Sequence, residues 1–81
     1  METKCYSITL SGERLNEHIV GFVAGVIYAI TGMPDRSYAW IEKRNGDRHT
    51  DIDATEEQRD LIEKAIGKAY PKATFEFTIS E

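Results

Sequence analysis

The chain has 81 residues, which is enough for one small domain and too few for two. Hydrophobic residues make up 41% of it and charged residues 30%, a globular rather than a disordered composition. Ten basic against fourteen acidic side chains give a formal charge of −4, which argues against direct binding to nucleic acid. The single Cys5 cannot form an internal disulfide, which favours a reducing, cytoplasmic environment. The longest apolar stretch, residues 19–33, is too short for a membrane span, so we expect no membrane partner.

The first third of the chain predicts a strand followed by a long helix. Residues 4–10 alternate as in a half-buried strand, with a core side formed by Tyr6, Ile8 and Leu10. Ser11 can cap a helix over residues 12–31, and Gly32 can end it. Inside this helix, Gly21 and Gly25 each cost about 1 kcal/mol relative to alanine. We therefore expect another surface, the sheet, to approach the helix closely at these glycines.

The pair Asn45-Gly46 predicts a hairpin between strands at residues 37–44 and 47–53. It suits a two-residue type I′ turn, in which both central residues have positive φ. The strand register of that turn predicts a core face with Ala39, Ile41, Thr50 and Ile52. The opposite, open face then carries Tyr38, Trp40, Glu42, His49, Asp51 and Asp53.

The last third predicts a second helix and a final strand. Thr55-Glu56-Glu57-Gln58 has the form of a capping box. It precedes a helical apolar stripe that stops before Pro71 and comprises Leu61, Ile62, Ala65, Ile66 and Ala69. Residues 73–80 alternate again, as in a strand.

The resulting order, β-α-β-β-α-β, predicts an α+β fold of the ferredoxin-like kind in a single domain, 1–81. We expect a two-layer sandwich in which an antiparallel four-stranded sheet carries both helices on one face. Right-handed crossovers make the first and third strands its central pair. The sheet should supply the core with Tyr6, Ile8, Leu10, Ile41, Ile52, Phe75, Phe77 and Ile79.

The open face of the predicted sheet offers two kinds of site. Trp40 and Tyr38 suit anchors for a protein partner, although Trp40 could equally pack across the hairpin. His49, Asp51 and Asp53 lie on one side of a strand and could form a metal or acid–base site, or only a solvated surface. A small ligand-binding or catalytic domain is therefore the alternative function. A catalytic zinc site needs three firmly placed ligands, which the pattern does not supply, so we predict no metal, cofactor or catalytic residue.

Acidic residues are concentrated between positions 51 and 63, against Arg59 as the only base: Asp51, Asp53, Glu56, Glu57, Asp60 and Glu63. Acids are expected in the first turn of any helix, so this ridge could be a solvated helix face. It could also be an electrostatic docking surface for a basic partner. The predicted partner-binding residues are Glu56, Glu57, Asp60, Glu63, Asp53, Trp40 and Tyr38.

Three short motifs resemble the DinI-like (MsgA-like) family of small bacterial and phage proteins. They are Met33-Pro34-Asp35, Asp53-Ala54-Thr55 followed by Glu56 and Glu57, and Ile79-Ser80-Glu81. The resemblance covers the second half of the chain. It implies a non-enzymatic regulator that binds the RecA recombinase filament through an acidic second helix, here with Glu56, Glu57, Asp60 and Glu63. We therefore expect a small acidic protein-binding regulator of a recombinase or another DNA-binding protein. An open edge strand would also allow a homodimer.

Overall fold

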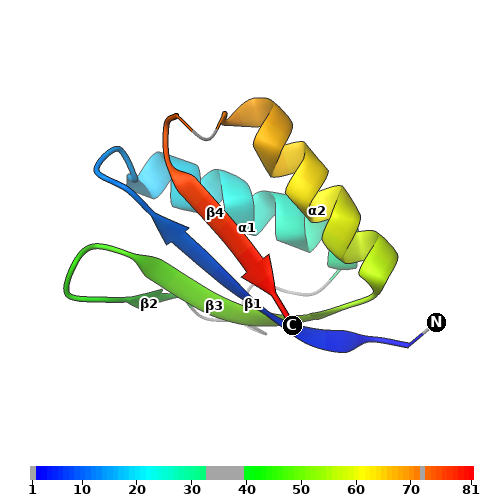
Figure 1. Cartoon of the computed structure of the whole chain (residues 1–81). Helices are drawn as coiled ribbons and strands as arrows, with labels where there is room; N and C mark the ends of the chain where they lie inside the picture. The colour runs from blue at the N-terminus through cyan, green and yellow to red at the C-terminus, as the bar shows by residue number, and fades with distance from the viewer. Residues whose placement is uncertain (1, 33–39, 72) are drawn as a thin grey trace.

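The computed structural model describes residues 2–32, 40–71 and 73–81. These residues form, in chain order, β1 Lys4–Ser11, α1 Glu17–Thr31, β2 Ile41–Glu42, β3 Arg48–Ala54, α2 Glu56–Ala69 and β4 Glu76–Ser80. The strands make one antiparallel sheet in the order β2-β3-β1-β4, and both helices lie on one side of it (Figure 1). The predicted small α+β fold with an antiparallel four-stranded sheet and two helices is confirmed.

The core lies between the sheet and the helices. Alternate residues of the central strands are buried, as the pattern predicts, and α1 and α2 supply the other half of the core. Each fully buried aliphatic or aromatic side chain contributes about 1.5–3 kcal/mol. The buried hydrophobic residues are Tyr6, Ile8, Leu10, Ile19, Val20, Val23, Ile27, Ile52, Ala54, Ile62, Ile66, Phe75 and Ile79. Two predicted core residues differ: Phe77 is only half-buried, and Ile41 is 59% exposed.

The hairpin turn explains why Ile41 is exposed. The Lys43 amide donates to the Asp47 carbonyl at 2.8 Å, and the Gly46 amide donates to the Lys43 carbonyl at 2.9 Å. Gly46 has φ 91°, whereas no non-glycine residue in the described ranges has positive φ, which excludes type I′ geometry. The loop therefore has three residues, Arg44 to Gly46, in the arrangement of a type I turn followed by a glycine bulge.

This longer turn shifts the strand register by one residue. Ile41 lies opposite His49, not opposite Thr50 as the two-residue turn required. A shift of one residue exchanges the two faces of a strand. Trp40 accordingly packs against the core, and the prediction that places it on the open face is wrong. Tyr38 and Ala39 lie outside the described residues.

Helix α1 begins later than predicted. Ser11 is the last residue of β1, and the helix cap is Asn16, whose Oδ1 accepts a hydrogen bond from the Ile19 amide at 3.0 Å. The intervening loop turns at Gly12, which has φ 127°. A Cβ at this position would lie 3.3 Å from Phe75 Cα, so the loop needs glycine for two reasons. The predicted end at Gly32 is confirmed by its left-handed conformation.

The glycines within α1 do not touch the sheet. Among the described residues, nothing lies within 4 Å of a Cβ added at Gly21 or Gly25, so the predicted close approach of the sheet is wrong. Both residues are exposed on the outer side of α1, because Ile19, Val23 and Ile27 turn the opposite side to the core. Within the described part of the chain, no helix is sufficiently long and apolar to cross a membrane.

The predicted capping box at the start of α2 is confirmed. Thr55 Oγ1 accepts a hydrogen bond from the Gln58 amide at 3.1 Å, and Gln58 Oε1 accepts one from the Thr55 amide at 2.9 Å. The Gln58 side chain also donates to the Ile30 carbonyl at 3.3 Å, which ties the start of α2 to the end of α1. The cap therefore fixes the direction in which the acidic residues of α2 project.

Candidate functional site

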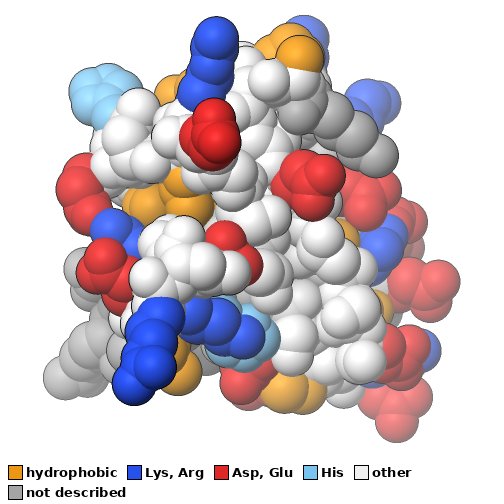
Figure 2. Space-filling view, turned by 60° about the vertical axis from the view of Figure 1, so that its left-hand side comes forward, with side chains coloured by type: hydrophobic (Ala, Val, Ile, Leu, Met, Phe, Trp, Pro, Cys, Tyr) orange, Lys and Arg blue, Asp and Glu red, His pale blue; other side chains and the backbone are white. Residues whose placement is uncertain are grey.

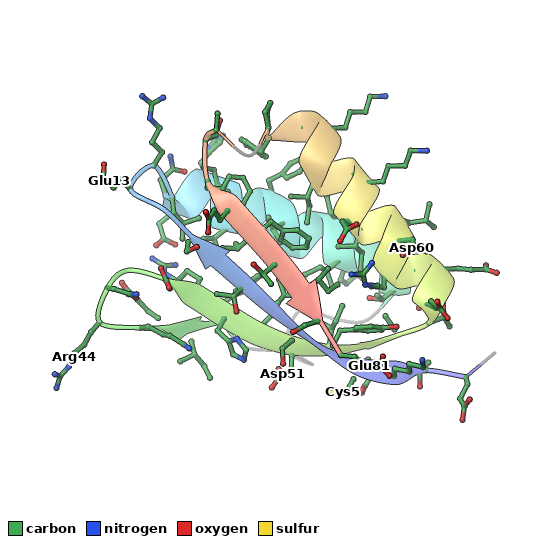
Figure 3. All side chains as sticks on the ribbon, in the orientation of Figure 1. Cys5, Glu13, Arg44, Asp51, Asp60 and Glu81 are labelled. Atoms are coloured by element: carbon green, nitrogen blue, oxygen red, sulfur yellow. The ribbon has the colours of Figure 1, made fainter. Side chains whose placement is uncertain are left out.

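Six exposed acidic residues surround the first turns of α2 and form what we call the acidic patch: Glu2, Glu56, Glu57, Asp60, Glu63 and Glu81. They come together because β1 begins where β3 and β4 end, as antiparallel neighbours must. Figure 3 shows Asp60 on α2 and Glu81 after β4 at the same end of the molecule. The patch thus joins the two chain ends to a helix start.

The surface of the acidic patch is hollowed in two places. One depression of about 540 Å³ is lined by Glu2, Lys4, Glu56, Glu57 and Asp60. A neighbouring one of about 250 Å³ is lined by Lys4, Tyr6, Glu56, Arg59, Asp60 and Glu81. Both are open, and in their linings carboxylates outnumber the two cations. They suit the end of a basic side chain better than an apolar ligand.

Two cations lie within the acidic patch and compensate part of its charge. Lys4 Nζ lies 3.3 Å from Glu81 Oε1, and this hydrogen bond and charge raise the pKa of Lys4. Arg59 contacts the carboxylates of Asp60 at 3.1 Å and Glu63 at 3.3 Å. It also donates to the Ile79 carbonyl. Exposed pairs of this kind contribute little to stability, because solvent screens them.

Most of the excess negative charge of the described residues lies in the acidic patch. Its six acids and two bases leave an excess of four negative charges, which equals the formal charge of the whole chain. The other eight acidic and eight basic residues cancel. In the view of Figure 2, charges of both signs are interspersed, and acidic side chains gather along the right-hand margin. In the described ranges, Glu56 and Glu57 form no ion pair, and Glu56 acts on Lys4 only through its charge.

The structure separates the predicted partner-binding residues. Glu56, Glu57, Asp60 and Glu63 stay together on α2, as the sequence pattern indicates. Asp53 is exposed on the open face of β3, the side opposite the helices. Trp40 is half-buried against the core, and Tyr38 lies outside the described residues. The acidic residues between positions 51 and 63 therefore belong to two surfaces, one on the open face of β3 and one on α2. They separate because strand and helix side chains project in different directions.

The sequence pattern missed the members of the acidic patch that come from the chain ends. Glu2, Lys4 and Glu81 are far from the start of α2 in sequence, and the charge pattern shows Arg59 only as an isolated base among acids. The predicted central pairing of β1 with β3 was the available signal, because it places Lys4 opposite Ala54, one residue before the cap of α2.

The open sheet face carries a row of polar side chains in contact with one another. Thr9 Oγ1 lies 3.2 Å from His49 Nδ1, and His49 Nε2 lies 3.3 Å from Asp51 Oδ1. Ser7 donates to the same Asp51 oxygen at 2.8 Å. Thr9 lies directly opposite His49 in the register, and Ser7 directly opposite Asp51, so cross-strand stabilisation accounts for the row. Hydroxyl, imidazole and carboxylate in this order also occur in acyl-transfer enzymes, but those enzymes add groups that bind the developing oxyanion.

A metal site at His49, Asp51 and Asp53 is not supported. Over residues 2–32, 40–71 and 73–81, no three His, Cys, Asp or Glu side chains are grouped to hold a metal ion. Cys5 is exposed and has no thiol partner. Neither protein-family models nor curated proteins yield a match to this chain.

Proposed function

We propose that the chain is a small non-enzymatic regulator that binds a basic protein partner through the acidic patch. The observation that carries this proposal is an excess of four negative charges at one hollowed end of the molecule. A surface of one sign steers an oppositely charged partner before contact and raises the association rate. The depression lined by Glu2, Glu56, Glu57 and Asp60 would receive a lysine or arginine side chain of that partner.

The resemblance to the DinI-like family supports one candidate partner, the RecA recombinase filament. Glu56, Glu57, Asp60 and Glu63, which the resemblance assigns to partner binding, all belong to the acidic patch. The sheet order β2-β3-β1-β4 supports the finer proposal of a ferredoxin-like arrangement. The free, exposed Cys5 supports placing the regulator in a reducing compartment such as the cytoplasm.

The test measures association with recombinase filaments assembled on single-stranded DNA, by surface kinetics at low and high salt. The test variant, Glu56→Gln with Asp60→Asn, removes two charges from residues that line both depressions. The matched control, Glu13→Gln with Glu76→Gln, removes two charges from exposed positions elsewhere. We expect the patch variant to associate about tenfold more slowly and to lose much of its salt dependence, while the control stays close to wild type. Equal association rates for the two variants would refute the assignment of the patch.

A further inference from the structure

The outer face of α1 is mostly apolar, and within the described structure it is exposed apart from the contact of Phe22 with Tyr70. It consists of His18, Gly21, Phe22, Gly25, Tyr28 and Ala29, all of which are exposed. Between Ile19 and Thr31 the helix contains no charged residue. Phe22 is 37% exposed and Tyr28 is 51% exposed. A helix that faces water on one side normally carries charged or polar residues there, and one that is apolar all round is normally buried.

The two glycines in this face lower the stability of α1 in an isolated chain. Glycine lowers the stability of a helix, and neither Gly21 nor Gly25 makes room for a neighbour in the part of the chain that the structure describes. Together with Ala29, at the same spacing of four, they form a shallow strip between Phe22 and Tyr28. Small residues between aromatic flanks allow another helix to approach closely.

The neighbouring side of α2 extends the face. Ring contact between Phe22 and Tyr70, with centroids 5.1 Å apart, and the bond from Gln58 to the Ile30 carbonyl place the two helices antiparallel. A stripe of exposed residues at helical spacing lies along α2: Glu57, Leu61, Lys64 and Lys68. Leu61 is 54% exposed. The stripe begins with an acid and ends with two bases, and Gln58 lies beside it and turns toward α1.

We propose that a second copy of the chain covers this helical layer, with α1 packed antiparallel on α1 about a two-fold axis at Gly25. In that arrangement Gly25 meets Gly25, and Gly21 lies opposite Ala29 of the second copy. The axis also brings the two α2 helices past each other in opposite directions. The acidic start of one α2, at Glu57, then approaches the basic end of the other, at Lys64 and Lys68. An isologous contact requires this kind of self-complementary charge pattern.

Charge also explains why the second copy would choose this layer. Each chain carries a formal charge of −4, so copies repel one another through their acidic patches. Glu56, Asp60 and Glu63 lie on the other flank of α2, where Arg59 reaches the Ile79 carbonyl of β4. Pairing through α1 keeps these residues apart and solvent-exposed. Glu57 lies between the two surfaces.

The size of the layer sets the strength of the contact. A helix of 15 residues is about 22 Å long, and two adjacent helices are about 20 Å wide. Such a face is small for a permanent dimer, so the pair should form reversibly as the concentration rises.

The first test is sedimentation over a range from low micromolar to near-millimolar protein. We expect wild type to pass from one chain mass to two. Gly25→Glu should weaken dimerisation by about tenfold or more, because it buries a charge without a partner. Gly67→Glu is the matched control, since Gly67 is exposed with nothing within 4 Å of an added Cβ, and it adds the same charge to the far flank of α2. Neither change lowers helix propensity, and far-ultraviolet circular dichroism checks the fold. A mass of one chain at every concentration would overturn the proposal, as would equal dimerisation of the two variants.

The second test locates the contact. Gly25→Cys in a Cys5→Ser background should form a disulfide between copies on mild oxidation, because a two-fold axis at Gly25 brings the two thiols together. Gly67→Cys in the same background should stay monomeric. Cross-linking at residue 67 but not at residue 25 would show a dimer built on another face, such as the β4 edge, and would overturn the arrangement proposed.

Discussion

The Glu17 carboxylate at the start of α1 accepts a hydrogen bond from the Arg48 guanidinium at the start of β3. Arg48 also lies 3.7 Å from Glu42 of β2, so one cation joins the helix layer to two strands. The hydrogen bond from Arg48, with its charge, lowers the pKa of Glu17. The same hydrogen bond raises the pKa of Arg48.

This pair predicts an acid-dependent loss of stability. Because the pKa of Glu17 is lower in the folded than in the unfolded chain, its contribution is fully present above the ordinary glutamate pKa. The contribution disappears as the pH falls through the lowered pKa. Glu17→Gln should therefore flatten the acidic part of a plot of urea midpoint against pH, and Arg48→Gln should flatten it similarly. Glu13→Gln, on the loop before α1, is the control, and an equal flattening there would contradict the assignment.

The hairpin turn predicts unequal roles for Asn45 and Gly46. Gly46→Ala should cost about 1–2 kcal/mol because it forces a side chain into a left-handed conformation. Asn45→Ala should cost less, about 0.5–1.5 kcal/mol, since it removes only the side-chain hydrogen bonds to Asp47. Urea unfolding of the two variants distinguishes the geometries, because a type I′ turn would penalise both positions through the backbone.

The strand register predicts opposite results at two neighbouring residues. Trp40→Ala should destabilise the fold toward the lower end of about 3–5 kcal/mol, because the ring packs against the core. Ile41→Thr should change the free energy of unfolding by less than about 0.5 kcal/mol, since this side chain is exposed. Thermal unfolding followed by circular dichroism gives both values. A larger loss of stability in Ile41→Thr than in Trp40→Ala would contradict this register and favour the two-residue turn.

Two glycine-to-alanine changes should alter the free energy of unfolding in opposite directions. Gly25→Ala should stabilise the monomer by about 0.5–1 kcal/mol at low concentration, because alanine favours the helix and open space surrounds the site. Gly12→Ala should destabilise it by about 1 kcal/mol or more, since φ is 127° and the new methyl group would press on the Phe75 backbone. Urea midpoints at dilute protein check the pair, and equal signs would contradict the local geometry described.

The sequence predicts a cap or a turn correctly where only one set of neighbouring residues can form it. The prediction is wrong where two sets of residues, or two turn lengths, fit the sequence equally well. The capping box of Thr55 and Gln58 involves neighbouring residues only, so α2 begins where the pattern predicts. Ser11 and Asn16 are both competent caps, and the chain uses Asn16 because β1 extends through Ser11 to pair with β4. Asn45-Gly46 fits turns of two or three residues, and the burial of Trp40 favours the longer one. The α2 part of the acidic patch follows from a short run, whereas Glu2, Lys4 and Glu81 join it through strand order.

A charge excess held at one end gives the molecule a permanent electric dipole moment directed between that end and the rest of the molecule. In the field of a basic surface the molecule experiences a torque as well as an attraction, so it turns its acidic end forward while still about one Debye length, or about 8 Å, away at physiological salt. Repulsion between copies is anisotropic for the same reason: it is strong end to end and weak elsewhere. Raising the ionic strength should therefore randomise the orientation of approach before it weakens the contact itself.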